Sequence, residues 1–340
     1  LVGSEMCIRD SYKKYPEVRK ILIGSSPYDE TSRFNKVAFP GKNTPILEIV
    51  DFLNARAREN QWGFVDFNRP MVAINQWEQA EDSMYTLCGK DRIHPSTDGH
   101  LVMAYLFLKA QGLAGKPVAD IRIDGAGKKV TRSDNCRVSD LSVSSDNLTF
   151  TYEAKSLPYP IDTSYYDNEK HTQADALSVI PFMDEMNYEG LSVSGLSDGY
   201  YGLTIGGEFI GRFTARELER GINMALLQNT PQYKQAMKIR QMNEERWLKE
   251  RKMREFYWVE YNLMRKTGML WACNEAAVDT LRKYRPHDIF LQWNGDLWLQ
   301  YMHKGIREDC VNEQQDLVNR IYEQNKPIPL RIEIKKFTDL

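Results

Sequence analysis

The sequence contains no run of eighteen or more apolar residues, and it does not begin with a basic segment followed by an apolar one. We therefore predict no membrane-spanning helix and no export signal within the printed residues. A net charge of −2 provides no strong field of one sign, so overall charge indicates neither nucleic acid nor anionic lipid as a partner. The 42% hydrophobic and 27% charged residues are typical of a globular protein with a buried core.

The five cysteines form no Cys-x-x-Cys pair, since they are scattered at positions 7, 88, 136, 273 and 310. Their spacing excludes a zinc ribbon and a thioredoxin-type site. Without Cys7 an even four remain, whose pairing and redox compartment the sequence leaves open. We predict no metal and no cofactor.

The first eleven residues, LVGSEMCIRDS, resemble the translation of a sequencing adaptor, which often precedes open reading frames from environmental DNA. A real but irregular N-terminus is the alternative. We treat residues 1–11 as an artefact and expect the native sequence to begin near Tyr12, with what preceded it cut off.

Residues 12–115 have the pattern of an α/β domain. The apolar run Lys20-Ile-Leu-Ile-Gly24 predicts a buried parallel strand, and Trp62 to Phe67 predicts the next strand. Between them, apolar residues recur at helical spacing from Pro45 to Glu59. This order predicts a strand-helix-strand crossover in a parallel sheet. After Ser96 as N-cap, a further helix runs to Gly112.

The rest of the chain changes pattern twice. Residues 116–212 alternate apolar and polar positions between turn sequences, which predicts a β-rich segment, with a surface loop from Pro158 to Thr172. Residues 213–340 form a predicted helical region. It opens with a capping box at Thr214, contains one long helix from Thr230 to Thr267, and packs that helix against helices at 272–284 and 307–324.

The segment Asp91-Arg92-Ile93-His94-Pro95 carries the predicted chemistry. A carboxylate three residues before a histidine can reach Nδ1 and fix the imidazole tautomer, which leaves Nε2 free to take the proton of a serine hydroxyl. Ser-His-Asp catalysis needs this contact between acid and base.

This segment, together with Gly99-His100-Leu-Val-Met-Ala, resembles the last conserved block of the SGNH (GDSL-type) ester hydrolases, and Ile23-Gly-Ser-Ser-Pro-Tyr-Asp29 resembles their penultimate strand region. The resemblance covers residues 12–113. It implies the C-terminal part of a three-layer, flavodoxin-like parallel-sheet domain, in which Asp91 orients the imidazole and His94 is the general base.

The family's Gly-Asp-Ser nucleophile block, its oxyanion glycine block and its Gly-x-Asn-Asp block are not found here. In family members they lie upstream, so we expect a truncated and, as given, inactive chain. Ser25 and Ser26 are poor nucleophile candidates because the 65 residues from Ser26 to Asp91 hold about one crossover unit. A loop serine capping a helix is the better interpretation.

The other candidate residues have structural explanations. His100 is interpreted as a helix-face residue and not as a metal ligand, and His171, His287 and His303 as isolated surface or structural residues. Lys234 to Lys266 is rich in basic residues, but its i,i+4 pairs Glu245–Lys249 and Glu250–Arg254 favour an exposed helix over a nucleic-acid site. For the cluster Trp293, Trp298 and Tyr301 we prefer core packing to an aromatic platform for a sugar or acyl chain.

The resemblance thus predicts an ester hydrolase that deacetylates or deacylates a carbohydrate or lipid ester. Its partner would be a small-molecule or glycan ester, and the resemblance implies a secreted or periplasmic full-length protein. The alternative is a non-catalytic binding or structural protein carrying a degenerate hydrolase domain. A nucleic-acid-binding helical tail is the weakest hypothesis. The oligomeric state is left open.

Overall fold

The computed structural model describes residues 14–34, 38–164 and 171–337. The proposed adaptor residues 1–11, and with them Cys7, lie outside these ranges. The chain forms two compact units. The first holds the described residues up to Pro117 together with Ile161–Tyr188, and the second holds Val118–Pro160 and the described residues from Glu189 onward. The predicted domain boundaries at 115/116 and 212/213 stay predictions.

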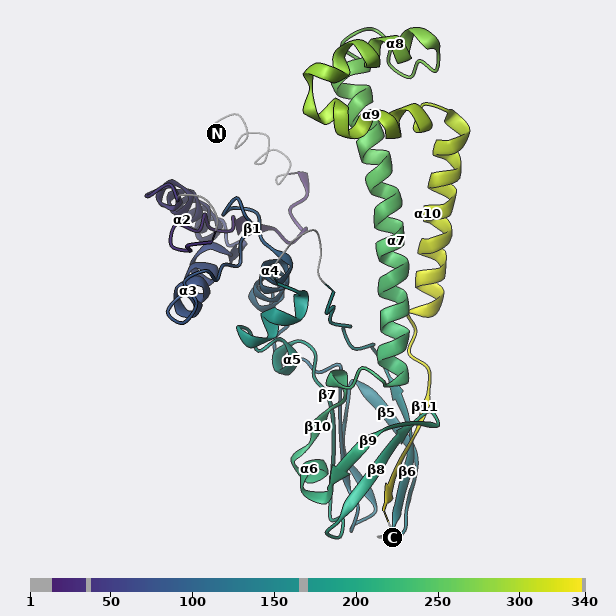
Figure 1. Ribbon diagram of the computed structural model, residues 1–340. Coiled ribbons are helices and arrows are strands. Elements are labelled where there is room, and N and C mark those ends of the chain that lie inside the picture. Colours follow the sequence, from purple (N-terminus) through teal and green to yellow (C-terminus); the bar gives the residue numbers. More distant parts are fainter. Residues whose placement is uncertain (1–13, 35–37, 165–170, 338–340) are drawn as a thin grey trace. The chain divides into compact units, whose positions relative to one another are not determined.

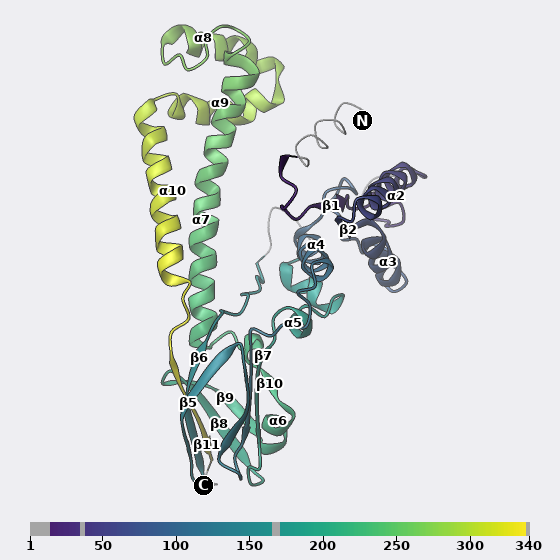
Figure 2. The same cartoon turned by 180° about the vertical axis from the view of Figure 1, so that it is seen from behind.

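The first unit contains the predicted crossover. Strands β1 (Ile21–Gly24) and β2 (Gly63–Asp66) pair in parallel, with Ile23 opposite Val65, and helix α2 (Asn43–Glu59) connects them. Helix α2 packs on both strands, and α4 (Thr97–Ala110) packs on β2 (Figures 1 and 2). Helix α3 (Asn68–Glu78) begins directly after β2. The α/β character predicted for this part of the chain is confirmed.

The described residues between Ile161 and Tyr188, which follow strands of the second unit, belong to the first unit. This return of the chain was not predicted from the sequence. These residues form the 3₁₀ turn η1 (Gln173–Ser178) and the short helix α5 (Phe182–Glu185). The Glu185 carboxylate accepts a hydrogen bond from the Tyr105 hydroxyl at 2.8 Å and from Lys109 Nζ at 2.9 Å, and its backbone carbonyl accepts from the Gly115 amide. These contacts attach α5 to α4. The expected loop at 158–172 lies partly outside the described residues.

The second unit contains a β-sandwich, so the predicted β-rich segment is confirmed. The described strands are β3 (Ala119–Asp124), β4 (Lys129–Asp134), β5 (Cys136–Val143), β6 (Asn147–Ala154), β7 (Glu189–Ser194), β8 (Tyr200–Ile205), β9 (Glu208–Thr214), β10 (Ile222–Asn223) and β11 (Leu330–Lys336). The predicted capping box opens α6 (Ala215–Arg220), where the Glu217 amide donates to the Thr214 hydroxyl.

Two sheets share one core. Their strand orders are β10-β7-β3-β4 and β5-β6-β11-β8-β9. Inward-facing residues of both sheets, such as Ile121, Phe150, Leu203 and Ile332, form a single apolar cluster. Two features were not predicted: β3 and β7 pair in parallel, and β11 inserts between β6 and β8. Both join segments that are far apart in the chain.

The predicted helical region is also confirmed. Helix α7 (Pro231–Val259) is capped by the Thr230 hydroxyl and continues into a π-helical turn, η3 (Glu260–Met264). After it come α8 (Glu275–Tyr284), the 3₁₀ turn η4 (Arg285–His287), α9 (Ile289–Tyr301) and α10 (Lys304–Gln324). Helix α9 was not predicted.

Helices α7 and α10 run side by side as a hairpin, with α8 and α9 at the end that lies away from the strands (Figures 1 and 2). Met253, Phe256, Leu281 and Trp298 belong to the core of this end. None of the helices in the described ranges combines the length and the apolar character that a membrane crossing requires.

Candidate active site

The loop at residues 88–95 carries the predicted acid and base, and backbone hydrogen bonds close it. The Gly89 amide donates to the His94 carbonyl at 2.6 Å, and an isolated antiparallel bridge joins the two ends of the loop. Ser96 then donates from its amide and from its hydroxyl to the Leu87 carbonyl, both at 3.0 Å. The loop therefore leads into α4 with little freedom.

Gly99, in the first turn of α4, allows this close approach. A Cβ atom at this position would lie 2.2 Å from the Leu87 carbonyl oxygen and 3.1 Å from Pro95 Cβ. The first distance is far below any van der Waals contact, so only glycine fits unless the backbone moves. The glycine of the predicted motif thus lets the segment before the loop lie against the helix after it.

Arg92 anchors the loop from inside. Its backbone lies in the left-handed region, with φ at 68°, and its side chain is buried. One guanidinium nitrogen, Nη1, donates to the carbonyls of Asp29 and Ser32 at 3.1 and 2.7 Å, and the Asp29 amide donates to the Arg92 carbonyl at 2.8 Å. The motif loop is thereby joined to the loop that follows β1.

That second loop is itself held by the buried carboxylate of Asp29. Oδ1 accepts hydrogen bonds from the amide and hydroxyl of Thr31 and from the amide of Ser32. Oδ2 accepts from the side-chain amides of Asn75 and Gln79 at 3.3 and 3.2 Å. Because every lone-pair direction has a donor, the carboxylate fixes this loop as a support for the motif loop.

Asp91 and His94 meet as the sequence predicts. The imidazole Nδ1 is hydrogen-bonded to Asp91 Oδ2, while Asp91 Oδ1 accepts from the backbone amides of Ile93 and His94 at 3.1 and 3.0 Å. The His94 side chain is 84% exposed, and within the described residues no hydrogen bond engages its Nε2. One ring nitrogen is therefore oriented, and the other is open for proton transfer.

The pKa of Asp91 supports the role of orienting acid. Partial burial raises this pKa, but the hydrogen bonds from the His94 ring and from the amides of His94 and Ile93 outweigh burial and lower it to about 2. Asp91 is therefore ionised throughout the pH range in which histidine works as a base. An ionised carboxylate at Nδ1 holds the proton there and stabilises the imidazolium that forms at Nε2.

Ser25 and Ser26 were predicted to be poor candidates for the nucleophile, and this stays a prediction. Ser25 and Ser26 lie in the loop after β1, and no hydrogen bond joins either of them to His94. The idea that one of them caps a helix is wrong, because the next helix, α2, begins only at Asn43. No other described serine hydroxyl is hydrogen-bonded to the His94 ring.

His100 and His171 lie in different surroundings. His100 is exposed on α4, as predicted for a helix-face residue. His171 is not isolated, because its Nδ1 lies 3.4 Å from the buried Oδ2 of Asp98 and its ring packs edge-on against Tyr85. Burial raises the pKa of Asp98, against the hydrogen bond from Ser96 and the charge of His171. No local sequence pattern indicates this contact, which joins residues 73 positions apart.

The remaining candidates lie in the helical region. His303 contacts the thiol of Cys273, with Nδ1 and Sγ 3.3 Å apart, so it is not isolated either. Trp298 and Tyr301 are buried in the core, as predicted, whereas Trp293 is 67% exposed. In the described part of the chain, no three His, Cys, Asp or Glu side chains come together as a metal site. The four described cysteines are free thiols.

The expected ion pairs on the long helix are present. Glu245 and Lys249 lie 3.9 Å apart, and Glu250 and Arg254 lie 3.7 Å apart. Lys249 also contacts Glu313 of α10 at 2.6 Å, so part of the basic charge serves to join the two helices of the hairpin.

Comparison with known proteins identifies relatives of both parts of the chain. Residues 237–326 match the family described as the diltiazem deacetylase C-terminal helical domain. Over 99% of its length the chain is similar to a solved structure, BT4096, a gut microbial diltiazem-metabolizing enzyme, with 40% sequence identity and a TM-score of 0.90. The similarity covers 76% of that enzyme's chain. No functionally curated protein matches.

These similarities identify the chain as a hydrolase acting on ester bonds. The chain belongs to the family of this diltiazem-metabolizing enzyme.

Proposed function

We propose that this protein is an SGNH-type esterase that removes an acyl group, most simply acetyl, from an oxygen atom of a small molecule or glycan. The observation that carries the proposal is the exposed Asp91–His94 pair, in which Nδ1 is oriented by a carboxylate and Nε2 is open. The family membership supports the ester-hydrolysing part of the proposal.

In the proposed reaction, His94 Nε2 takes the proton of a serine hydroxyl as the serine oxygen attacks the ester carbonyl carbon. The tetrahedral intermediate collapses, the imidazolium returns its proton to the leaving alcohol, and an acyl-enzyme remains. Water, deprotonated by the same nitrogen, releases the carboxylic acid and restores the serine. Asp91 stays ionised throughout and stabilises the imidazolium twice in each cycle.

The serine and the oxyanion donors are proposed to come from sequence upstream of Tyr12. Two observations support this. No described serine hydroxyl is hydrogen-bonded to His94, and about a quarter of the solved relative's chain lies outside the similarity. The printed chain alone should then hydrolyse esters no faster than buffer, whereas the chain extended by its upstream coding sequence should be active.

The substrate proposal rests on the relatives. One is named a diltiazem deacetylase and the other a diltiazem-metabolizing enzyme, and deacetylation is the removal of an acetyl group. We therefore propose an O-acetyl ester of a small molecule as the substrate, with diltiazem itself as the first compound to assay.

The test compares two histidine variants of the extended protein. His94→Ala should lower kcat for p-nitrophenyl acetate and diltiazem by about 10⁴- to 10⁶-fold, the range found when a member of a catalytic triad is removed. His100→Ala is the matched control, because this exposed histidine lies six residues further on and should leave kcat unchanged. Equal rates for wild type and His94→Ala would remove His94 from the mechanism.

A further inference from the structure

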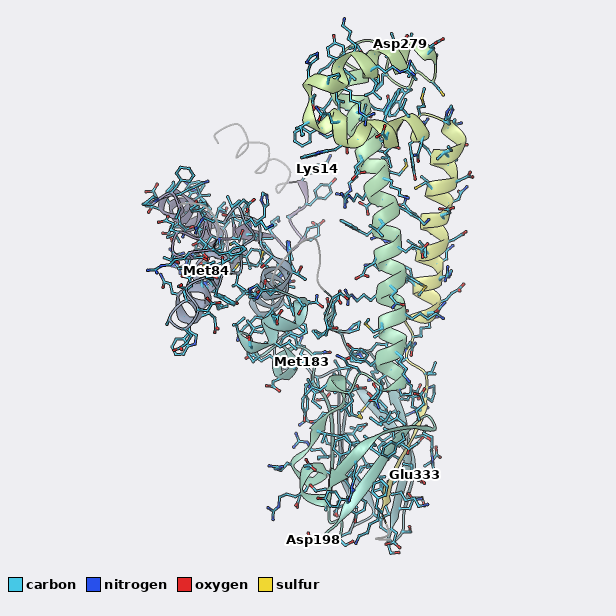
Figure 3. All side chains as sticks on the ribbon, in the orientation of Figure 1. Lys14, Met84, Met183, Asp198, Asp279 and Glu333 are labelled. Atoms are coloured by element: carbon cyan, nitrogen blue, oxygen red, sulfur yellow. The ribbon has the colours of Figure 1, made fainter. Side chains whose placement is uncertain are left out.

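A cleft of about 410 Å³ lies at the end of the helical hairpin, far along the chain from the acid-base loop. Its lining comes from the end of α7 and η3 on one side and from the α8–η4–α9 connection on the other. Figure 3 labels Asp279 on α8 at this end. A volume of this size is within the range of small-molecule sites.

The shape of this cleft depends on the π-helical turn. The Arg265 amide donates to the Glu260 carbonyl at 2.7 Å, five residues back, which widens the helix locally. The buried Glu260 carboxylate accepts from the Trp298 indole and from the Trp271 amide, both at 2.8 Å. A buried carboxylate that fastens a π turn to two neighbouring segments keeps the turn in place. Such turns are frequent at functional sites.

The cleft offers flat apolar surfaces. Leu263 and Leu291 are buried beneath it, while Trp258 is half-buried and Tyr284 exposed at its walls. Phe290 packs beside Trp258, with ring centroids 5.2 Å apart, and so supports that wall. An aromatic ring system is the kind of group that such walls contact best, through stacking and edge-to-face packing.

Among the described residues, the cleft carries one cation that has no ion-pair partner, Lys266. Lys266 and His287 line it, and neither forms an ion pair with any residue in the ranges that the structure describes. The acidic Asp288 also lines it, but its carboxylate accepts the amides of Phe290 and Leu291 as the N-cap of α9. The ammonium group of Lys266 therefore has no ion pair among the described residues, while Oδ1 of Asp288 is bound to the backbone at the start of α9.

We propose that this cleft binds a small aromatic carboxylate with a single ring or two fused rings. The ring system would lie against Trp258 and Tyr284, and the carboxylate would lie at Lys266. The ammonium group selects the negative charge, and the aromatic walls select the flat body. This site is distinct from the acid-base loop and does not depend on the proposed esterase reaction.

Isothermal titration of the full chain with 2-naphthoate, and with neutral 2-naphthol as the comparison, tests the proposal. We expect saturable binding of the acid, tighter than that of the alcohol. Lys266→Gln should weaken binding of the acid about tenfold and leave that of the alcohol unchanged, as expected for one charge-assisted contact.

Two further variants make the result specific. Lys252→Gln is the matched control, because this exposed lysine lies on α7 outside the cleft lining, and it should change nothing. Tyr284→Ala, also at an exposed position, should weaken binding of acid and alcohol alike. The proposal is overturned if no saturable binding of the acid occurs up to millimolar concentration. It is equally overturned if Lys266→Gln binds like wild type, or if Lys252→Gln weakens binding as much as Lys266→Gln does.

Discussion

Glu189 lies in the core of the second unit with no exposed surface, and its replacement by glutamine should stabilise that unit at neutral and alkaline pH. The Tyr152 hydroxyl donates to Glu189 Oε1 at 2.7 Å, and Gln232 Nε2 lies 3.3 Å from both carboxylate oxygens. Burial raises the pKa of Glu189 to about 7, because these hydrogen bonds only partly offset the loss of water.

The size and sign of the effect follow from this pKa. In the unfolded chain the carboxyl titrates near 4.5, so the folded protein binds this proton more tightly. The stability linked to it is complete below pH 4.5 and is lost as the pH rises to about 7. A pKa difference of about 2.5 corresponds to about 3 kcal/mol in the free energy of unfolding.

Glutamine keeps the shape and has no charge to bury. Its amide can also donate to Gln232 Oε1, which is buried and has no hydrogen-bond partner among the described residues. The free energy of unfolding of Glu189→Gln, relative to wild type, should therefore be higher at pH 8 than at pH 4 by about 3 kcal/mol.

Urea unfolding at pH 4 and pH 8, followed by tryptophan fluorescence, measures this difference. Five of the seven tryptophans belong to the second unit, namely Trp247, Trp258, Trp271, Trp293 and Trp298. Tyr152→Phe is the companion variant, since it removes a donor to the carboxylate and should destabilise the protein more at pH 8 than at pH 4. A difference between Glu189→Gln and wild type that is the same at both pH values would refute the reasoning.

Two further predictions concern the acid-base loop. Gly99→Ala should destabilise the first unit by about 1–3 kcal/mol, because its Cβ would lie 2.2 Å from the Leu87 carbonyl oxygen. Thermal unfolding measures this loss of stability. Gly112→Ala is the comparison, because Gly112 has a positive φ but no atom near its Cβ position, so that this variant is strained without being crowded. Arg92→Ala should release the loop, so that the Gly89 amide, bonded to the His94 carbonyl, exchanges its hydrogen faster while amides of the sandwich do not change. Unchanged exchange at Gly89 would show that Arg92 does not hold the loop.

Local patterns predicted the elements that depend on nearby residues. The crossover from Ile21 to Asp66 has clear periodicity, and the long helix has a clear start signal at Thr230. Both are found, although the α-helix ends at Val259 and not at Thr267. The contact of Asp91 with His94 was also predictable, because only three residues separate them and one tight loop brings their side chains together.

Contacts between distant segments were not predictable in this way. Residues 330–336 alternate like a strand, but they follow a long helical region, and nothing in the local sequence indicates pairing with β6 and β8. The role of Arg92 was missed because a non-glycine residue at positive φ has no sequence signature. Helix α9 was missed although core packing was preferred for its aromatic residues; Trp298 and Tyr301 are buried, whereas Phe290 and Trp293 are exposed.

The central position of β11 has a consequence for the order in which the protein can form. Leu330 pairs with Tyr152 and Ile332 with Ile205, so the five-stranded sheet cannot close before the whole hairpin of α7 and α10 has been synthesised. During translation the edges of β6 and β8 that later pair with β11 remain unpaired. Unpaired edges are the parts of a sheet most prone to pair with another chain. The helical hairpin, whose helices pack on one another within residues 231–324, can form first and bring the last strand back to the gap.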